Sequence, residues 1–253
     1  RASTGQRPTH SMTLRSSAKT RRIYRMEVGT SGFMTSQSQW LKLDMLNCIE
    51  VNSSFYRLPT EKTIQRLTAF PERVSFIFKV SKYITHIKRL KDVEEAWGRF
   101  WDSVKPLAPR MITVLFQLPP TFHNKPENVD RILALKKYLP SSITPAFEFR
   151  DQSWIDESTY TLFKKLNWCI VGTMIGKQEG TKWMGSMPGG LFLPPKTCDM
   201  TYVRVHGRKG FRGSMSDSAL LNLRKQILSR STFMNVCMFN NVFFDRRGTS
   251  CEF

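Results

Sequence analysis

Cys48-Ile49-Glu50-Val51-Asn52-Ser53-Ser54-Phe55-Tyr56-Arg57-Leu58-Pro59 is a stretch in which polar side chains end an apolar strand. Ile49 and Val51 are β-branched and alternate with Glu50 and Asn52, which predicts a short strand followed by a polar turn. Since strand side chains alternate between two faces, Glu50 and Asn52 are expected on the same face. A buried carboxylate and carboxamide need hydrogen-bond partners, so this pair indicates ligand binding rather than packing.

Later strands repeat this pattern, with a polar group near the strand end and apolar residues on the opposite face. The pairs that share the polar face are Ile77 and Lys79, Leu115 and Gln117, Glu148 and Arg150, Arg204 and His206, and Met238 and Asn240. Phe76 and Phe78 are examples of the opposite, apolar face. Polar groups at the carboxyl ends of strands are typical of the active sites of (β/α)₈ barrels.

The order of elements predicts a single α/β domain, a TIM-barrel-like (β/α)₈ parallel barrel over residues 23–253. Its expected strands are 24–28, 49–52, 74–79, 111–117, 145–150, 168–173, 201–206 and 234–240. Its expected helices are 36–46, 61–69, 93–104, 127–138, 155–166 and 216–228, with a loop at Thr85 and His86. A length of 253 residues suits one such barrel. The final helix is expected to be missing or truncated.

The chain is strongly basic, with 39 Lys and Arg against 20 Asp and Glu and a net charge of +19. Residues 1–22 contain six of the positive charges and no acidic residue, so 19 − 6 = +13 remains for the rest. We predict that residues 1–22 are a disordered basic tail or a mitochondrial or plastid transit peptide. The remaining charge indicates an anionic partner or simply a basic solvated surface.

The five cysteines are not spaced as zinc or redox pairs, and a reducing intracellular compartment fits them best. No apolar run approaches the roughly 20 residues of a membrane span, so no membrane partner is expected. The sequence contains no pattern that assigns a cofactor or an oligomeric state.

Seven motifs occur in order and together resemble the YecE-like family of domains of unknown function. They are Gly29-Thr30-Ser31-Gly32, Glu50 to Arg57, Lys79 with Thr85-His86, Phe116 to Pro120, Glu148-Phe149-Arg150 with Ser153-Trp154, Tyr202 to Gly207, and Phe239-Asn240-Asn241. The resemblance implies a TIM-barrel-like fold and implies no reaction. The chain departs from the family in three places. Phe33 stands where Trp is usual, the segment before the second strand is shorter than usual, and the segment after Asn241 replaces the usual final helix.

The candidate site collects the polar residues of these strand ends. We predict catalytic roles for Glu50, Glu148 and His206, and substrate binding by Asn52, Lys79, His86, Gln117, Arg150, Arg204, Asn240 and Asn241. Three interpretations of Glu50 and Glu148 remain open: proton transfer with a histidine, metal binding, or interior carboxylates neutralised by Lys79, Arg150 and Arg204. Metal binding is disfavoured because no HExxH-like cluster accompanies them, and no metal ligand is assigned.

Two functional hypotheses follow. The first is an enzyme, a hydrolase or isomerase, that acts on a phosphorylated or otherwise anionic small molecule at the carboxyl-end mouth of the barrel. The glycine-rich basic loop 207–213 is a candidate phosphate site or an exposed turn. The alternative is a nucleic-acid-binding protein that uses its basic surface. Because strand 234–240 is apolar on both faces, we also expect Phe239 to stay partly exposed and to reduce stability.

Overall fold

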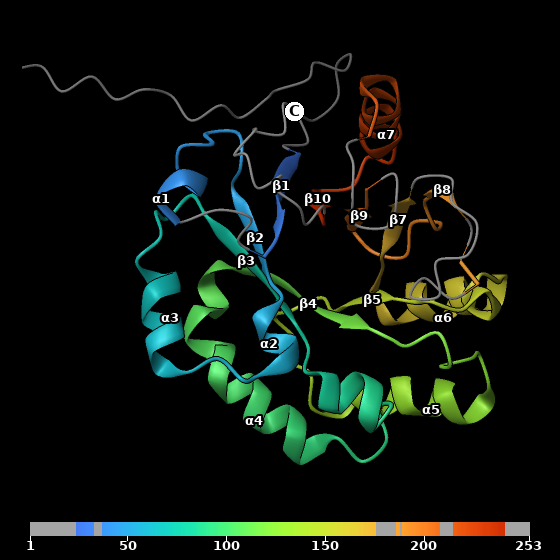
Figure 1. The fold of residues 1–253 in the computed structure, drawn as a ribbon. Helices are drawn as coiled ribbons and strands as arrows, with labels where there is room; N and C mark the ends of the chain where they lie inside the picture. Colours follow the sequence, from blue (N-terminus) through green and yellow to red (C-terminus); the bar gives the residue numbers. More distant parts are fainter. Residues whose placement is uncertain (1–23, 33–36, 176–185, 188, 208–214, 241–253) are drawn as a thin grey trace, which may run out of the picture.

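The computed structural model describes residues 24–32, 37–175, 186–187, 189–207 and 215–240 (Figure 1). The predictions for tail 1–22, Phe33, loop 208–213, Asn241 and the end of the chain lie outside these residues. The strands are β1 (Arg25–Ser31), β2 (Cys48–Val51), β3 (Ser75–Lys79), β4 (Met111–Gln117), β5 (Ala146–Glu148), β6 (Cys169–Ile170), β7 (Gly172–Ile175), β8 (Gly190–Phe192), β9 (Met200–Val205) and β10 (Met234–Phe239).

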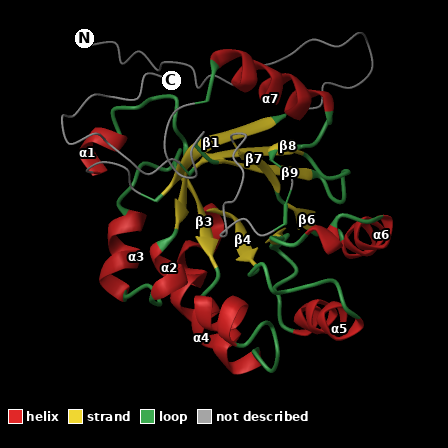
Figure 2. Ribbon diagram, turned by 45° about the vertical axis from the view of Figure 1, so that its right-hand side comes forward, coloured by secondary structure: helices red, strands yellow, loops and turns green. Residues whose placement is uncertain are grey.

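Helices surround the outside of the curled sheet (Figure 2). They are α1 (Gln37–Trp40), α2 (Ser53–Tyr56), α3 (Glu61–Thr68), α4 (Glu94–Val104), α5 (Pro126–Ala134), α6 (Glu157–Leu166) and α7 (Asp217–Ser229), with a π-helix η1 (Tyr83–Ile87) and 3₁₀ turns η2 (Lys105–Arg110), η3 (Leu135–Lys137) and η4 (Gln152–Trp154). Within the described part of the chain, no helix is long and apolar enough to cross a membrane.

The sheet is curled and almost entirely parallel, which gives a mixed α/β fold. Its strand order is β6-β5-β4-β3-β2-β1-β10-β9-β7-β8, and only the β7–β8 pair is antiparallel. β6 pairs with β5, whereas β7 pairs with β9. Only Val171 separates β6 from β7 in the chain, so a single segment pairs with β5 near one end of this strand order and with β9 near the other.

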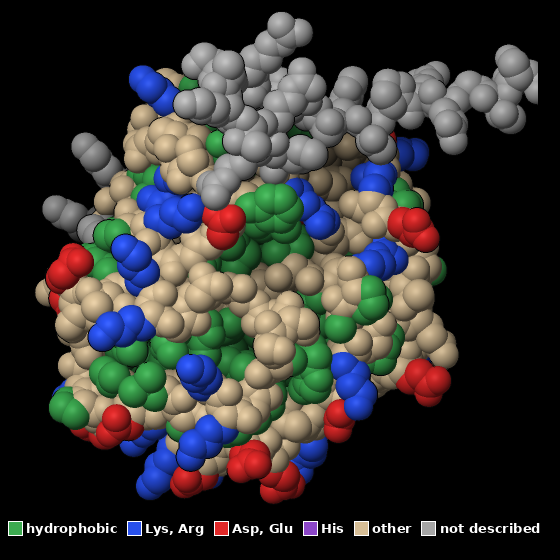
Figure 3. Space-filling model, turned by 180° about the vertical axis from the view of Figure 1, so that it is seen from behind, with side chains coloured by type: hydrophobic (Ala, Val, Ile, Leu, Met, Phe, Trp, Pro, Cys, Tyr) green, Lys and Arg blue, Asp and Glu red, His purple; other side chains and the backbone are tan. Residues whose placement is uncertain are grey.

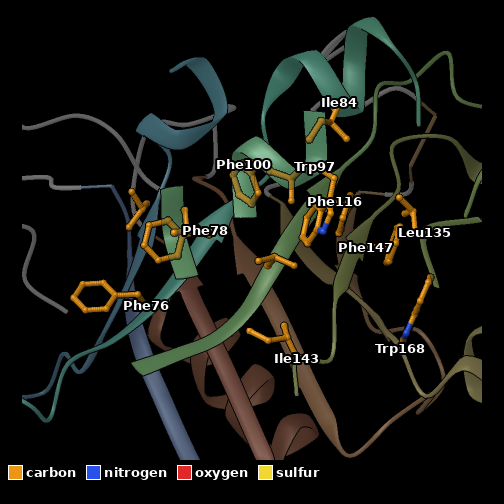
Figure 4. Close-up of a cluster of buried hydrophobic side chains, with 14 of the residues drawn as sticks. Phe76, Phe78, Ile84, Trp97, Phe100, Phe116, Leu135, Ile143, Phe147 and Trp168 are labelled. Carbon is orange, nitrogen blue, oxygen red and sulfur yellow. The ribbon is translucent and has the colours of Figure 1, made fainter. Parts of the chain in front are cut away.

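Most of the parallel strands, such as β2, β3, β5 and β9, bury both faces, as parallel strands do when helices cover one side. The outward face forms the larger apolar cluster, which includes Phe76, Phe78, Phe116 and Phe147 (Figure 4). Phe116 and Phe147 stack with ring centroids 4.9 Å apart. The inward face forms a separate cluster that contains Ile77, Leu115, Ala146, Tyr202, Val236 and Met238. The sequence therefore assigned the two faces of these strands correctly.

Local capping explains where several helices start. Thr60 accepts a hydrogen bond from the backbone N–H of Thr63 at the start of α3. Asp156 caps α6 through the N–H of Thr159 at 2.8 Å, and Ser216 caps α7 through Ala219 at 3.4 Å. These short polar side chains satisfy N–H groups that have no partner within the helix.

Several local predictions were wrong. The polar turn after β2 is the short helix α2, and Asn52 has helical dihedral angles (φ −73°, ψ −23°), so it does not continue the face of Glu50. The expected loop at Thr85 and His86 is the π-helix η1. The expected strand 168–173 is divided into β6 and β7, and β8 was not predicted. Short polar sequences fit both turns and single helical turns, so their pattern could not separate the two.

The outer face of β10 packs partly against α7. Cys237 is buried in a cluster with Leu223 and Ile227 of α7. Phe239, two residues later on the same face, packs against this cluster and is partly buried. The expectation that Phe239 stays partly exposed agrees with this packing, whereas its consequence for stability remains a prediction.

Candidate functional site

Charged and polar side chains collect where the parallel strands end. Glu50, Lys79, Gln117, Glu148, Arg150, Arg204, His206 and Asn240 are all buried. They lie in the last position of a strand, or at most two residues from its end, in β2, β3, β4, β5, β9 and β10. Parallel pairing brings these ends to one edge, for example through Gln117 opposite Glu148. The inward apolar cluster lies below them on the same faces.

Arg204 is the centre of this cluster. Its guanidinium donates to both carboxylate oxygens of Glu50, with Nη2 2.6 Å from Oε1 and Nε 2.9 Å from Oε2. Its Nη1 lies 2.5 Å from Oε2 of Glu148. Burial alone would lower the pKa of Arg204, but the carboxylates of Glu148 and Glu50 raise it above its ordinary value. Arg204 is therefore a permanent cation that joins β2, β5 and β9.

Glu50 has two further donors that the sequence analysis did not identify. The hydroxyl of Tyr202 donates to Oε2 and that of Ser31 donates to Oε1. Burial and the charge of Glu50 raise the pKa of Tyr202 well above its ordinary value, so its hydroxyl keeps its proton. Tyr202 stands two residues before Arg204 and Ser31 ends β1, so the same strand-end pattern could have identified both.

Glu148 is surrounded by cations. Arg150 donates to Oε1 through Nε at 2.6 Å and Nη2 at 2.5 Å, and the amide of Gln117 donates to the same atom at 3.1 Å. Burial alone would raise the pKa of Glu148, but Arg150 and Arg204 together hold it well below its ordinary value. Glu148 is therefore ionised throughout the physiological pH range.

Lys79 has a different environment from the two arginines. Its ammonium nitrogen lies 4.2 Å from the ring centroid of Phe55, and no hydrogen bond or ion pair joins it to any described residue. Burial, with the charge of Arg204 next in size, lowers the pKa of Lys79 to about 7. Lys79 consequently changes its charge near neutral pH.

The two histidines of this region contact different neighbours. His206 Nδ1 is 3.3 Å from the side-chain nitrogen of Asn240, and burial and Arg204 lower the pKa of His206 well below its ordinary value. His86 packs edge-on against Phe55 with ring centroids 5.0 Å apart. Burial and Lys79 lower the pKa of His86 to about 4. Both imidazoles are therefore neutral at pH 7.

The structure brings most of the predicted site residues together. Glu50, Glu148, Gln117, Arg150 and Arg204 form one connected network. Asn52 lies at the start of α2 beside Gly32, and its Oδ1 is buried without a hydrogen-bond partner among the described residues. Asn241 lies outside the described residues.

The two glutamates have the contacts expected of interior carboxylates that are neutralised by neighbouring cations. The cations that form ion pairs with them are Arg150 and Arg204, whereas the predicted ion pair with Lys79 is not formed. No group of three or more His, Cys, Asp or Glu side chains suited to a metal ion occurs in the part of the chain that the structure describes. The proton-transfer roles of Glu50, Glu148 and His206 remain predictions.

The comparisons with known proteins agree with the fold and the order of the motifs. Residues 29–247 match the family described as "Protein of unknown function DUF72". This chain belongs to the DUF72 family. It is similar to UPF0759 protein YunF of Bacillus subtilis (strain 168), with 32% identity over 171 residues that cover 63% of this chain and 58% of YunF. It is also similar to UPF0759 protein YecE of Escherichia coli (strain K12), with 29% identity over 97 residues, 34% of this chain and 36% of YecE. These matches span less than two thirds of either relative.

Crystal structures of other DUF72 proteins share the fold. One from Thermotoga maritima MSB8 has a TM-score of 0.71 at 27% identity and covers 86% of this chain and 93% of its own. One from Enterococcus faecalis V583 has a TM-score of 0.73 at 19% identity, with 88% and 92% covered. DUF72 membership thus establishes the family and the shared fold and implies no particular activity.

Proposed function

We propose that this DUF72 protein is an enzyme, a hydrolase or isomerase, that binds a phosphorylated or otherwise anionic small molecule at the carboxyl ends of its strands. The observation that carries the proposal is the charge of the buried cluster. When Lys79 is protonated, it supplies with Arg150 and Arg204 three cationic groups against the two carboxylates of Glu50 and Glu148. An anion near Lys79 would balance this surplus, because Coulomb interactions are strong where water is excluded.

Burial divides the cluster into an inner and an outer layer. In the inner layer, Glu50, Glu148 and His206 are 0% exposed and Arg204 is 1% exposed. In the outer layer, the exposed fraction is between 6% and 9% for each of Lys79, Gln117, Arg150 and Asn240. We therefore assign the anion to Lys79 and Arg150, with Gln117 and Asn240 as the groups that orient it. The Oδ1 of Asn52, which has no hydrogen-bond partner among the described residues, is a further acceptor for a ligand hydroxyl.

The charges also suggest a division of chemical roles. Glu148 is held ionised by Arg150 and Arg204, which suits it to positioning the arginines. His206 and His86 are neutral imidazoles, and a neutral imidazole can accept a proton from a substrate. We assign proton transfer to His206, with Glu50 and Glu148 as the groups that fix the electrostatics around it.

We further propose that the sheet closes into a TIM-like barrel, which would surround this site. The support is the segment 169–175, which pairs with β5 through Cys169 and Ile170 and with β9 through Gly172 to Met174. Such closure would place the cluster at the carboxyl-end mouth, where barrel enzymes have their active sites.

Nucleic-acid binding is the competing hypothesis. On the face shown in Figure 3, Lys and Arg side chains are scattered and interleaved with Asp and Glu. Binding that depends on phosphate neutralisation weakens steeply as salt rises. A nucleic-acid site on the outer surface would not depend on Lys79, whose side chain is only 9% exposed.

The test is a binding and turnover screen of phosphate esters, sugar phosphates and carboxylates, with oligonucleotides as the competing class. Binding is measured by calorimetry, and turnover is compared with that of Glu148→Gln. Lys79→Met should weaken binding of the selected anion at least tenfold, equivalent to about 1.4 kcal/mol. Lys82→Met is the matched control, because Lys82 is exposed at the start of the neighbouring π-helix.

Lys79→Met is expected to fold, since it replaces a buried amine that has no hydrogen bond to a described residue with an apolar chain of similar length. Circular dichroism and gel filtration check this point. If Lys79→Met and Lys82→Met bind the anion equally well, the proposed site is wrong. Selective binding of oligonucleotides by both variants would favour the competing hypothesis.

A further inference from the structure

Two residues of α2 contact Lys79, one at its backbone and one at its side chain. The hydroxyl of Ser54 lies 2.6 Å from the carbonyl oxygen of Val51 and 2.7 Å from that of Lys79, so it links the ends of β2 and β3 to α2. The same helix α2 supplies Phe55, whose ring lies under the Lys79 nitrogen. Backbone and side chain of Lys79 are thus both positioned by residues next to the charged cluster.

The carboxylates around Lys79 are already paired with other cations. Glu50 is bound in a bidentate manner by Arg204, and Glu148 by Arg150 and Arg204. Lys79 therefore shares a buried region with two fixed guanidinium groups, without a carboxylate at ion-pair distance among the described residues. A lysine that is desolvated and adjacent to other cations favours its neutral form, and a neutral amine is nucleophilic.

We propose that Lys79 is a covalent catalyst, whose amine attacks an aldehyde or ketone carbonyl of the substrate and forms a Schiff base. The proposal rests on the proposed function for the anionic part of that substrate, which Arg150 would hold. It assigns the substrate to a narrower class, small molecules that carry both an anionic group and a carbonyl group.

The step balances without a further reactant. The lone pair of Nζ forms the C–N bond while the π electrons of the carbonyl move to its oxygen, which takes up a proton as the nitrogen loses one. The resulting carbinolamine then takes up a second proton and loses its hydroxyl as water, which leaves a protonated imine. His86, which packs on the same Phe55 ring, is placed to exchange the protons.

The reactivity of Lys79 depends on the ionisable groups that face it from each neighbouring element. These are Glu50 of β2, His86 of η1, Glu148 and Arg150 at the end of β5, and Arg204 and His206 at the end of β9. With a pKa of about 7, near half of Lys79 is neutral at pH 7. A lysine with the reference pKa of about 10.4 is neutral in roughly one molecule in 2,500 at that pH.

Reductive trapping tests the proposal. The folded 253-residue chain is incubated at pH 7 with glyoxylate, a two-carbon aldehyde that carries a carboxylate, and cyanoborohydride converts any imine to a stable secondary amine. Peptide mass spectrometry then measures the modified fraction of each lysine. Lys79 should be modified at least tenfold faster than the exposed Lys82, and Lys82→Arg should leave the modification of Lys79 unchanged.

Acetaldehyde, a neutral aldehyde of the same length, separates this proposal from the anion site. Rapid trapping of Lys79 by glyoxylate but not by acetaldehyde supports both the Schiff-base proposal and the anion site. Equal trapping by the two aldehydes supports the Schiff base and contradicts the anion site. If both aldehydes modify Lys82 and leave Lys79 unmodified, the Schiff-base proposal is overturned, whereas anion binding that depends on Lys79 in calorimetry would still stand.

Discussion

Arg204 connects two carboxylates that come from different strands and are far apart in the sequence. Its side chain is 1% exposed, and both glutamates are fully buried. Removing one partner of a buried ion pair leaves an uncompensated charge, which is far more costly than the pair is stabilising. The role of Arg204 is therefore to supply the buried cation that pairs with Glu50 and Glu148 at the ends of β2 and β5.

Arg204→Met should lower the free energy of unfolding by about 3–5 kcal/mol, because it leaves Glu50 and Glu148 without their shared cation. Chemical denaturation measures this change. Arg224→Met on the exposed side of α7 is the control and should stay within about 0.5 kcal/mol of the wild type. Adding Glu50→Gln to Arg204→Met should restore part of the loss. Equal stability of Arg204→Met and the control would contradict the assigned role.

Strand alternation predicted which of these side chains face inward, but it could not determine which of them form ion pairs or hydrogen bonds with each other. Alternation in the strands placed Glu50, Lys79, Gln117, Glu148 and Arg204 on inward faces. It could not show that the arginines neutralise both carboxylates while Lys79 contacts Phe55. Pairing depends on distances between strands that are neighbours only in space, and one sequence contains no direct record of them.

At the scale of elements, β1 and β2 approach each other closely at Gly29. Gly29 is opposite Cys48 in the parallel register, and a Cβ built on Gly29 would lie 1.8 Å from the carbonyl oxygen of Cys48. Backbone atoms of a paired strand cannot move away without breaking the pairing. The glycine therefore allows β1 to place Ser31 beside Glu50.

Gly29→Ala should destabilise the protein by about 3 kcal/mol or more, at the upper end of overpacking costs. Gly98→Ala is the matched control, since Gly98 lies inside α4 and its added Cβ would meet no atom within 4 Å. This second change should raise stability by about 0.5–1 kcal/mol. Melting temperatures that move in the same direction for both variants would contradict the packing described between β1 and β2.

Elements with a long periodic pattern were predictable, whereas short irregular ones were not. The apolar spacing of Val93, Trp97, Phe100 and Val104 predicted α4, and these side chains are buried. The predictions for the segments that form η1 and α2 were wrong, because each segment is a single helical turn whose residues fit a loop equally well. Both carry residues next to Lys79, so the errors fell at the site.

At the scale of the whole molecule, the half-buried His86 and the buried His206 make stability depend on pH. Burial and Lys79 lower the pKa of His86 from 6.5 to about 4, and the pKa of His206 is lowered in the same direction by burial and Arg204. Between these folded values and 6.5 the unfolded chain binds more protons than the folded one. Folding stability from these groups is therefore complete above pH 6.5 and is lost as pH falls toward 4.

The free energy of unfolding should thus decrease when the pH is lowered from 7.5 to 5, as measured by chemical denaturation at both values. His86→Gln should reduce this decrease, because glutamine cannot take up the proton in the unfolded state. An unchanged pH dependence in His86→Gln would show that His86 has the same pKa in both states.

In the proposed anion site, Lys79 is a buried amine whose charge changes near neutral pH. Nuclear magnetic resonance of protein labelled with ¹³Cε lysine measures this change, with the Lys79 signal assigned by its loss in Lys79→Arg. The signal should titrate near pH 7, and saturating sulfate, which stays ionised throughout, should move its midpoint upward. A Lys79 signal that titrates near the reference value of about 10.4, and that sulfate does not move, would contradict the claim.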